Sequence, residues 1–145
     1  MRRVRGRLAC EAKLSAGKGS TFMSAVVIVM VAVFFLGMGV YGLLAPAALI
    51  RPFGIVADSV EARTEIRAVY GGFGVAVAGL LLAAAADVGG LRAGMAVTVA
   101  VSLLGMAFGR LVARSVERPS AFYPSWLYFW VEVVCGGALL AAVAW

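Results

Sequence analysis

The stretch EIRAVYGGFGVAVAGLLLAAAA, residues 65–86, joins an ionisable opening to a long apolar run. Glu65, Arg67 and Tyr70 lie within its first six residues, and residues 75–86 are all apolar or glycine. A membrane-spanning helix needs about 20 mostly apolar residues. The stretch therefore predicts a membrane span whose entrance carries an acid, a base and a phenol.

Three further runs of the chain share this apolar character. Hydrophobic residues make up 63% of the sequence and charged residues 14%, against roughly 45–50% and about 25% in globular domains. The short alternating segments of a transmembrane barrel are absent. The sequence therefore predicts an all-α, integral membrane four-helix bundle. Its predicted spans cover residues 24–45, 64–86, 93–113 and 125–145.

The first 22 residues differ from the rest in composition. They hold six Lys or Arg against Glu11 alone, which accounts for +5 of the formal charge of +6. We expect a basic, disordered tail over residues 1–22 and a membrane domain over residues 23–145. A signal peptide is the alternative, but its apolar region is usually about 7–15 residues, which favours an uncleaved first span. Met23 is an alternative start of translation.

The basic residues also bear on orientation, because Lys and Arg concentrate on the cytoplasmic side of membrane proteins. With four spans both termini share one side, which then holds the six basic residues of the tail and Arg92. We therefore predict a multi-pass protein of the inner cell membrane with both termini cytoplasmic. Without the tail the preference reverses. The basic residues of the opposite side are Arg51, Arg63, Arg67, Arg110, Arg114 and Arg118.

Several kinds of site lack their usual residues. The chain contains no histidine, the commonest ligand of haem and zinc and the commonest general base. We predict no metal site and no cofactor. Cys10 lies in the tail and Cys135 in an apolar run, so no disulfide between them is expected. A nucleic-acid partner is not expected either, because a membrane-embedded core offers no folded basic face.

Glu132 is the most informative ionisable residue. It lies seven residues into the predicted fourth span, about 10 Å deep at 1.5 Å per residue. An ionised group at that depth costs several kcal/mol unless it is paired or hydrated. With four spans, the 46–63 and 114–124 loops emerge on the same face of the membrane. The depth of Glu132 is counted from this face.

A polar pocket is the arrangement that satisfies these groups. Glu132 is expected to pair with Arg110 or Arg67, with Tyr70 donating a hydrogen bond and Glu65 at the rim. A purely structural tie between helices is the competing interpretation. For Glu65 and Arg67 alone, an ordinary interfacial position also fits, with the arginine stem lying along its helix.

Small residues predict where helices approach closely in lipid. Gly105 and Gly109 form a GxxxG pattern in the third span, and Gly72 and Gly74 begin similar patterns in the second. We predict that these glycines pack the third span against the second. A homo-oligomer contact through the same faces is the alternative.

Aromatic residues gather where the fourth span begins, and most are expected to be interfacial anchors. The group is Phe122, Tyr123, Trp126, Tyr128, Phe129 and Trp130.

Four of these features occur together in a known family. They are EIRAVYGG at 65–72, GR at 109–110, RPS at 118–120 and Glu132. Over about residues 24–145 the chain resembles a set of small bacterial membrane proteins catalogued as a domain of unknown function, number 4345. The resemblance implies a four-helix membrane protein without an assigned activity. Members often carry Asp-Gly before the Pro-Ser, where this chain has Glu117-Arg118. The chain is also distantly similar to DoxX-type membrane proteins, which implies a fold and no function.

Three classes of function follow. The favoured class is a binding or accessory protein whose polar pocket takes a lipid headgroup, a quinone or another amphiphile, with membrane lipids as further partners. The second is a membrane enzyme with Glu132 or Glu65 as acid–base and Tyr70 as donor. The lack of histidine and of a nucleophile–base pair weighs against it, so no enzymatic activity is assigned. The third is a subunit of an oligomeric transporter, since four spans are too few for the usual inverted repeat.

Overall fold

The computed structural model describes the backbone of residues 2–117 and 122–144, and within them the side chains from residue 19 onward. All regular structure in this part of the chain is helical, which confirms the predicted all-α class. The elements are α1 (Arg2–Leu44), α2 (Pro46–Ile50), the 3-10 turn η1 (Arg51–Phe53), α3 (Val60–Ile66), the π-helical η2 (Arg67–Gly72), α4 (Phe73–Ala85), the 3-10 turn η3 (Val88–Gly90), α5 (Arg92–Glu117), the π-helical η4 (Phe122–Trp126) and α6 (Leu127–Ala144).

Among the described residues, four helical segments are long and apolar enough to cross a membrane, as predicted. The second consists of α3, η2 and α4 joined end to end, and it begins where the Ser59 hydroxyl accepts a hydrogen bond from the Ala62 amide at 3.0 Å. Such a side-chain cap satisfies one of the free N–H groups at a helix start. The fourth span is predicted to end at Trp145, and this residue lies outside the described residues. The four segments are Gly19–Leu44, Val60–Ala85, Arg92–Glu117 and Phe122–Ala144.

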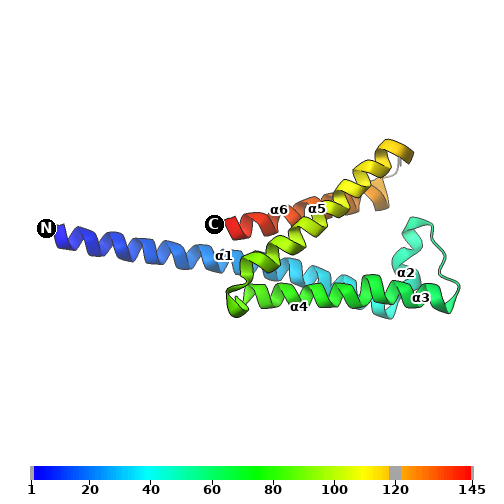
Figure 1. Ribbon diagram of the computed structural model, residues 1–145, viewed down its shortest axis with the longest axis horizontal. Helices are drawn as coiled ribbons and strands as arrows, with labels where there is room; N and C mark the ends of the chain where they lie inside the picture. The colour runs from blue at the N-terminus through cyan, green and yellow to red at the C-terminus, as the bar shows by residue number, and fades with distance from the viewer. Residues whose placement is uncertain (1, 118–121, 145) are drawn as a thin grey trace.

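The first helix continues back through most of the tail that the sequence predicts to be disordered. α1 is one helix from Arg2 to Leu44, and it projects beyond the bundle in Figure 1. The tail contains no proline, and adding residues to an existing helix costs far less than starting one. The basic composition of residues 1–22 therefore does not interrupt the backbone of α1.

The helices form two antiparallel pairs (Figure 1). α1 packs chiefly against α4 and η2, and α5 packs chiefly against α6. Contacts between the two pairs are fewer and involve α1 with α6 and α4 with α5. The C-terminus and the α4–α5 turn lie at one end of the bundle, while α2, α3 and the end of α5 lie at the other. We call these the terminal end and the loop end.

The apolar core occupies the half of the bundle nearest the terminal end. It includes Ile28 of α1, Leu81 of α4 and Leu139 of α6, all fully buried, and Leu103 of α5. A separate small cluster, formed by Leu49, Ile50, Ala57 and Ile66, holds the 46–59 segment against the loop end. The ionisable residues Arg110 and Glu132 lie in the other half of the bundle, between the apolar core and this small cluster.

Glycines bring α1 and α4 into backbone contact. A Cβ atom at Gly39 of α1 would lie 2.7 Å from the Val75 backbone nitrogen, and one at Gly74 would lie 3.0 Å from the Gly39 Cα atom. A Cβ atom at Gly71 of η2 would lie 3.0 Å from the Leu43 backbone nitrogen. Close approach of this kind is how small residues associate helices in lipid. The second span therefore uses its glycines against the first span.

The predicted contact of the third span through Gly105 and Gly109 is wrong. A Cβ atom at either residue would meet nothing within 4 Å, so this face of α5 is open. Gly72 is also open, with only the Arg67 carbonyl of its own helix 3.8 Å away. A face of small residues does not specify which neighbour it meets, and here α1 presents the better-matched glycines.

The α4–α5 turn is closed by Arg92. Its Nε donates to the Ala84 carbonyl at 3.1 Å and its Nη2 to the Ala85 carbonyl at 3.0 Å. These are terminal carbonyls of α4 that lack partners within the helix. Asp87, at a φ of 54°, accepts from the Arg92 amide.

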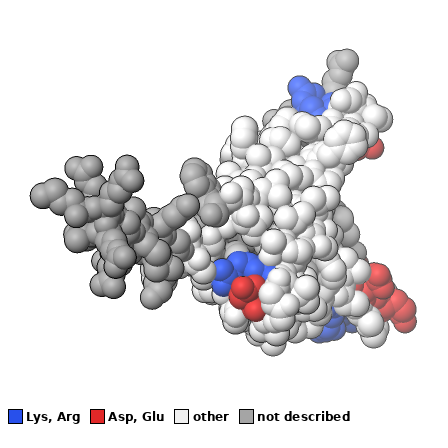
Figure 2. Space-filling model, turned by 60° about the vertical axis from the view of Figure 1, so that its left-hand side comes forward, with Lys and Arg blue, Asp and Glu red and all other residues white. Residues whose placement is uncertain are grey.

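Charged side chains lie near the two ends of the bundle on the face seen in Figure 2, and the surface between them is uncharged. This distribution is that of a multi-pass membrane protein, in which the uncharged band meets hydrocarbon.

Candidate functional site

Glu132 and Arg110 form a fork-shaped ion pair between α6 and α5. The Arg110 Nε lies 3.0 Å from Oε1 and 2.9 Å from Oε2 of Glu132, and the Arg110 Nη2 lies 2.9 Å from Oε1. Glu132 is 5% exposed. Two-pronged pairs of this kind are the strongest and most directional hydrogen-bonded ion pairs in proteins. Of the two partners predicted for Glu132, the structure places Arg110 against it.

The guanidinium is less buried than the carboxylate and is not fully used. The Arg110 side chain is 29% exposed, against 7% for the Glu132 side chain. A guanidinium carries five N–H donors, and the bonds to Glu132 engage only Nε and Nη2. Within residues 19–117 and 122–144, Nη1 of Arg110 has no hydrogen-bond acceptor. The pair therefore has a closed, acidic side and an open side with N–H donors.

One aromatic ring lies against the Arg110 guanidinium, and a second ring contacts the first. The Arg110 guanidinium carbon lies 5.5 Å from the centre of the Tyr128 ring, within the range of a cation–π contact. Tyr128 precedes Glu132 by one helical turn, so both belong to the same face of α6. The Tyr128 ring in turn contacts Phe53 of η1, with ring centres 5.5 Å apart. Phe53 thus joins the 46–59 segment to the start of α6.

One turn of α6 nearer the terminal end, a glycine lets α5 and α6 pack closely. A Cβ atom at Gly136 of α6 would lie 3.1 Å from the Ala100 carbonyl and 3.1 Å from Cγ of Leu104. Gly136 follows Glu132 by one turn, so the same face of α6 that carries the carboxylate allows α5 to approach.

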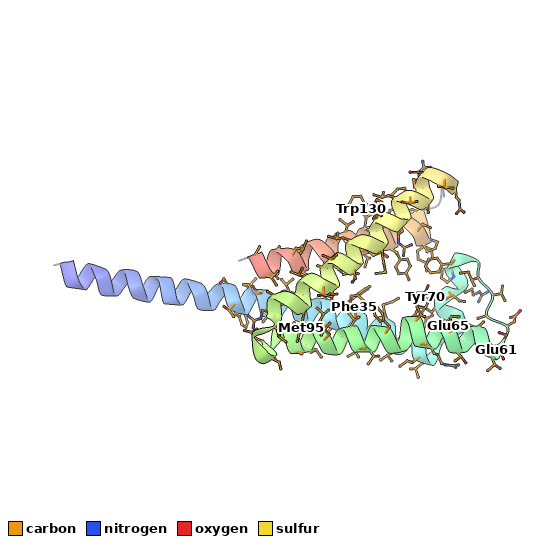
Figure 3. All side chains as sticks on the ribbon, viewed as in Figure 1. Phe35, Glu61, Glu65, Tyr70, Met95 and Trp130 are labelled. Atoms are coloured by element: carbon orange, nitrogen blue, oxygen red, sulfur yellow. The ribbon has the colours of Figure 1, made fainter. Side chains whose placement is uncertain are left out.

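The other three predicted pocket residues do not join this pair. Arg67 is exposed, and its Nε donates to the Leu43 carbonyl at the end of α1 at 3.0 Å. Tyr70 is 52% exposed and Glu65 is exposed. Neither makes a hydrogen bond or an ion pair with Glu132 or Arg110. Figure 3 shows Glu65 and Tyr70 on the rod formed by α3, η2 and α4, and Trp130 on the α5–α6 side.

These positions follow from the helix pairing. Arg67 lies on η2, which packs against α1, whereas Arg110 lies on α5, which packs against α6. Arg67 therefore finds an unpaired carbonyl of α1, one of those that a helix end leaves without a partner. The prediction of a single pocket assumed that the second and fourth spans are neighbours at this level.

Sequence reasoning did not assign Tyr128 or Phe53 to the site. Tyr128 carried a usable signal, because its spacing of four residues from Glu132 puts the two on one helical face. Phe53 carried none, because its contact depends on how the 46–59 segment folds over the loop end.

In the described part of the chain, no three His, Cys, Asp or Glu side chains come together in a way that could hold a metal ion.

Comparison with known proteins gives one match. A family model described as "Domain of unknown function (DUF4345)" matches residues 23–143. It covers the four candidate spans almost completely and begins after the basic tail. No curated protein matches the chain, and no solved structure does.

Proposed function

Because the chain belongs to the DUF4345 family, whose description names no activity, we propose a function from the site itself: the protein binds the polar head of a lipid-like amphiphile at the Arg110–Glu132 pair. The observation that carries this proposal is the asymmetry of the pair. Glu132 is buried and both its oxygens are engaged, whereas Arg110 is partly exposed and keeps N–H groups without an acceptor in the described residues.

A purely structural tie does not require that asymmetry. An arginine inside a membrane is costly unless its donors are satisfied or wetted. A ligand oxygen placed at Nη1 would satisfy donors that the described protein atoms leave open.

The charge of the pair limits the kind of head. Arg110 and Glu132 neutralise each other, so the site carries no net charge to attract a strongly ionic group. It offers donors on its open side, which suit an uncharged acceptor such as an ester, hydroxyl or quinone oxygen. The ligand we propose is therefore an amphiphile with hydrogen-bond acceptors in its head and an apolar remainder in the bilayer.

The enzymatic alternative has less support. A general acid–base must exchange a proton with its substrate. Both Glu132 oxygens already accept N–H donors from Arg110, so proton transfer would first require breaking the pair. Glu65 and Tyr70, the other groups proposed for catalysis, make no hydrogen bond or ion pair with Glu132.

A role as an accessory subunit or oligomer subunit is the second candidate. The observation that favours it is the open face of α5, where a Cβ atom added at Gly94, Gly105 or Gly109 would meet nothing within 4 Å. Small residues on a lipid-facing helix allow a second helix to approach closely. This role is compatible with ligand binding at Arg110, which lies on the α6 side of α5.

For location we propose the inner cell membrane with both termini cytoplasmic. The support is the basic tail together with Arg92, which both belong to the terminal end. A reporter fused after the last residue, made with and without residues 1–22, tests it. Activity of a cytoplasmic reporter in the full chain supports the proposal, and activity of a reporter that matures only outside the cytoplasm refutes it.

The test of ligand binding uses the full chain purified in a mild detergent and native mass spectrometry. We expect one lipid-like molecule retained per chain, and at least a tenfold lower occupancy in Arg110→Met. Arg114→Met is the matched control, because Arg114 is an exposed arginine one turn further along α5. It should retain the ligand.

Two outcomes oppose the proposal: wild-type protein free of any bound molecule, and equal occupancy in Arg110→Met and wild type. If Arg110→Met does not fold, Arg110→Lys serves instead. Lysine keeps the charge beside Glu132 but lacks the planar set of donors, so binding should fall while the helical content is unchanged.

A further inference from the structure

A groove runs between α1 and α6 on the surface of the bundle. Its volume is about 460 Å³, and it is lined by residues of α1 from Val27 to Phe34 and residues of α6 from Leu127 to Ala138. The lining side chains are all apolar except for the indole N–H of Trp130 and the thiol of Cys135. Lining positions recur every three or four residues on both helices, so the groove follows the helix axes.

The length of the groove suits a linear occupant. Leu127 and Ala138 are eleven residues apart, which is about 17 Å along a helix. An extended hydrocarbon chain can follow the groove over that length.

The surroundings select an apolar chain. Both walls belong to candidate membrane spans, Gly19–Leu44 and Phe122–Ala144. Acyl and isoprenoid chains are the linear apolar groups available at that level, and filling the groove with one restores the contacts that an empty surface lacks.

The groove and the polar site lie at the same level along α6. α1 and α6 are antiparallel, so Phe34 and Leu127 lie toward the loop end and Val27 and Ala138 toward the terminal end. Tyr128, which lies under the Arg110 guanidinium, directly follows Leu127. Val131 lines the groove and directly precedes Glu132. The groove and the ion pair thus lie at the same level of α6, on faces about 100° apart around the helix.

From this arrangement we infer that the α1–α6 groove holds the linear hydrocarbon chain of the amphiphile whose head lies at Arg110 and Glu132. This inference rests on the proposed function and extends it. It assigns the ligand class: one apolar chain of about 17 Å in the groove, attached to an uncharged head with acceptor oxygens.

Trp130 provides a direct probe of the groove. The chain contains three tryptophans, Trp126, Trp130 and Trp145. With Trp126→Phe and Trp145→Phe, the fluorescence of Trp130 reports on a single site. The ligand used is a monoacylglycerol with a brominated chain, because bromine quenches tryptophan on contact. We expect quenching that saturates at one molecule per protein in detergent.

Matched substitutions on α6 test where the chain lies. Ala138→Phe fills the far end of the groove and should raise the half-saturating concentration at least tenfold. Ala141→Phe adds the same ring at an exposed position outside the groove and should leave it unchanged. Quenching that never saturates, or that responds equally to both substitutions, would overturn the inference.

The same titration separates this inference from the proposed function. If Arg110→Met weakens binding and Ala138→Phe does not, the polar site stands and the groove assignment fails. If Ala138→Phe weakens binding and Arg110→Met does not, the groove holds a chain but the proposed head site fails.

A chemical block covers the case in which Ala138→Phe does not fold. In a Cys10→Ser background, Cys135 is the remaining cysteine, and it lines the groove. Attaching a short alkyl group to Cys135 after purification should reduce saturable quenching at least tenfold. Unchanged quenching after complete modification would contradict the groove as the chain site.

Discussion

The two helix pairs of this protein are held together in different ways. α1 and α4 meet through glycines, and their backbones approach until a Cβ atom at Gly39 would lie 2.7 Å from the Val75 nitrogen. α5 and α6 also meet at a glycine, Gly136, but one turn away they are joined by the buried pair of Arg110 and Glu132. Close backbone packing gives a contact with no chemical function, whereas an ion pair introduces groups able to bind something else.

This difference explains why the candidate site lies on α5 and α6. Apolar helices gain little by burying surface from apolar lipid, so packing and hydrogen bonds decide their association. The α1–α4 pair satisfies that need with shape alone. A buried ion pair is often no more stabilising than apolar residues of the same volume, which agrees with the binding role proposed for the α5–α6 pair.

The largest effect should come from breaking the ion pair on one side. Glu132→Gln leaves the Arg110 guanidinium without its carboxylate inside the bundle, and we expect a loss of about 3 kcal/mol in the free energy of unfolding. Thermal unfolding in detergent measures it.

Replacing both partners sharpens the same test. Arg110→Met combined with Glu132→Met removes both charges and fills the space, so the double variant should be more stable than Glu132→Gln. It should also fail to retain the amphiphile. A double variant that is less stable than Glu132→Gln would show that the pair is there for stability.

The next effect tests the glycine contact between α1 and α4. Gly39→Ala places a methyl group against backbone atoms that cannot rotate away, and we expect a loss of about 2 kcal/mol. Gly37→Ala is the control on the same helix, because nothing lies within 4 Å of its Cβ position. Thermal unfolding of both should show a lower midpoint for Gly39→Ala alone. A Gly39→Ala midpoint equal to that of Gly37→Ala would mean that α1 and α4 can separate without cost.

A smaller effect is expected at Arg67, which joins the end of α1 to η2. Arg67→Met removes the hydrogen bond from Nε to the Leu43 carbonyl, and an exposed bond of this kind contributes about 1 kcal/mol. Thermal unfolding measures the loss, and ligand occupancy by mass spectrometry should be unchanged. Reduced occupancy in Arg67→Met would return this residue to the binding site that the sequence predicted for it.

The sequence was sufficient for the fold class and for the expectation that Glu132 pairs with an arginine. The spans follow from the length of the apolar runs, and depth in the membrane makes an unpaired Glu132 too costly, so an arginine on a neighbouring helix had to meet it. Choosing Arg110 over Arg67 required knowing which helices are neighbours. Composition does not contain that information, because most side chains of every span are apolar.

The glycine faces show the same limit. GxxxG at Gly105 and Gly109 predicts that a helix can approach, and the structure leaves that face open. Gly39 and Gly42, which do make the close contact with the second span, lie in a run where glycines are separated by only one or two residues. A spacing pattern therefore identifies a surface able to pack closely, and the matching surface decides whether it does.

The smallest effect on stability should come from Gly105→Leu, which tests whether α5 meets a second copy of the chain. The Cβ position is open, so the free energy of unfolding of a single chain should change by less than about 0.5 kcal/mol. If small residues at this face join two copies, a leucine there prevents the close approach of the helices and should lower crosslinking of chains in native membranes severalfold. Gly37→Leu, at an equally open position on α1, is the control and should leave crosslinking unchanged. Equal crosslinking in both variants would exclude the α5 face as the contact and leave ligand binding at the α5–α6 pair as the function to pursue.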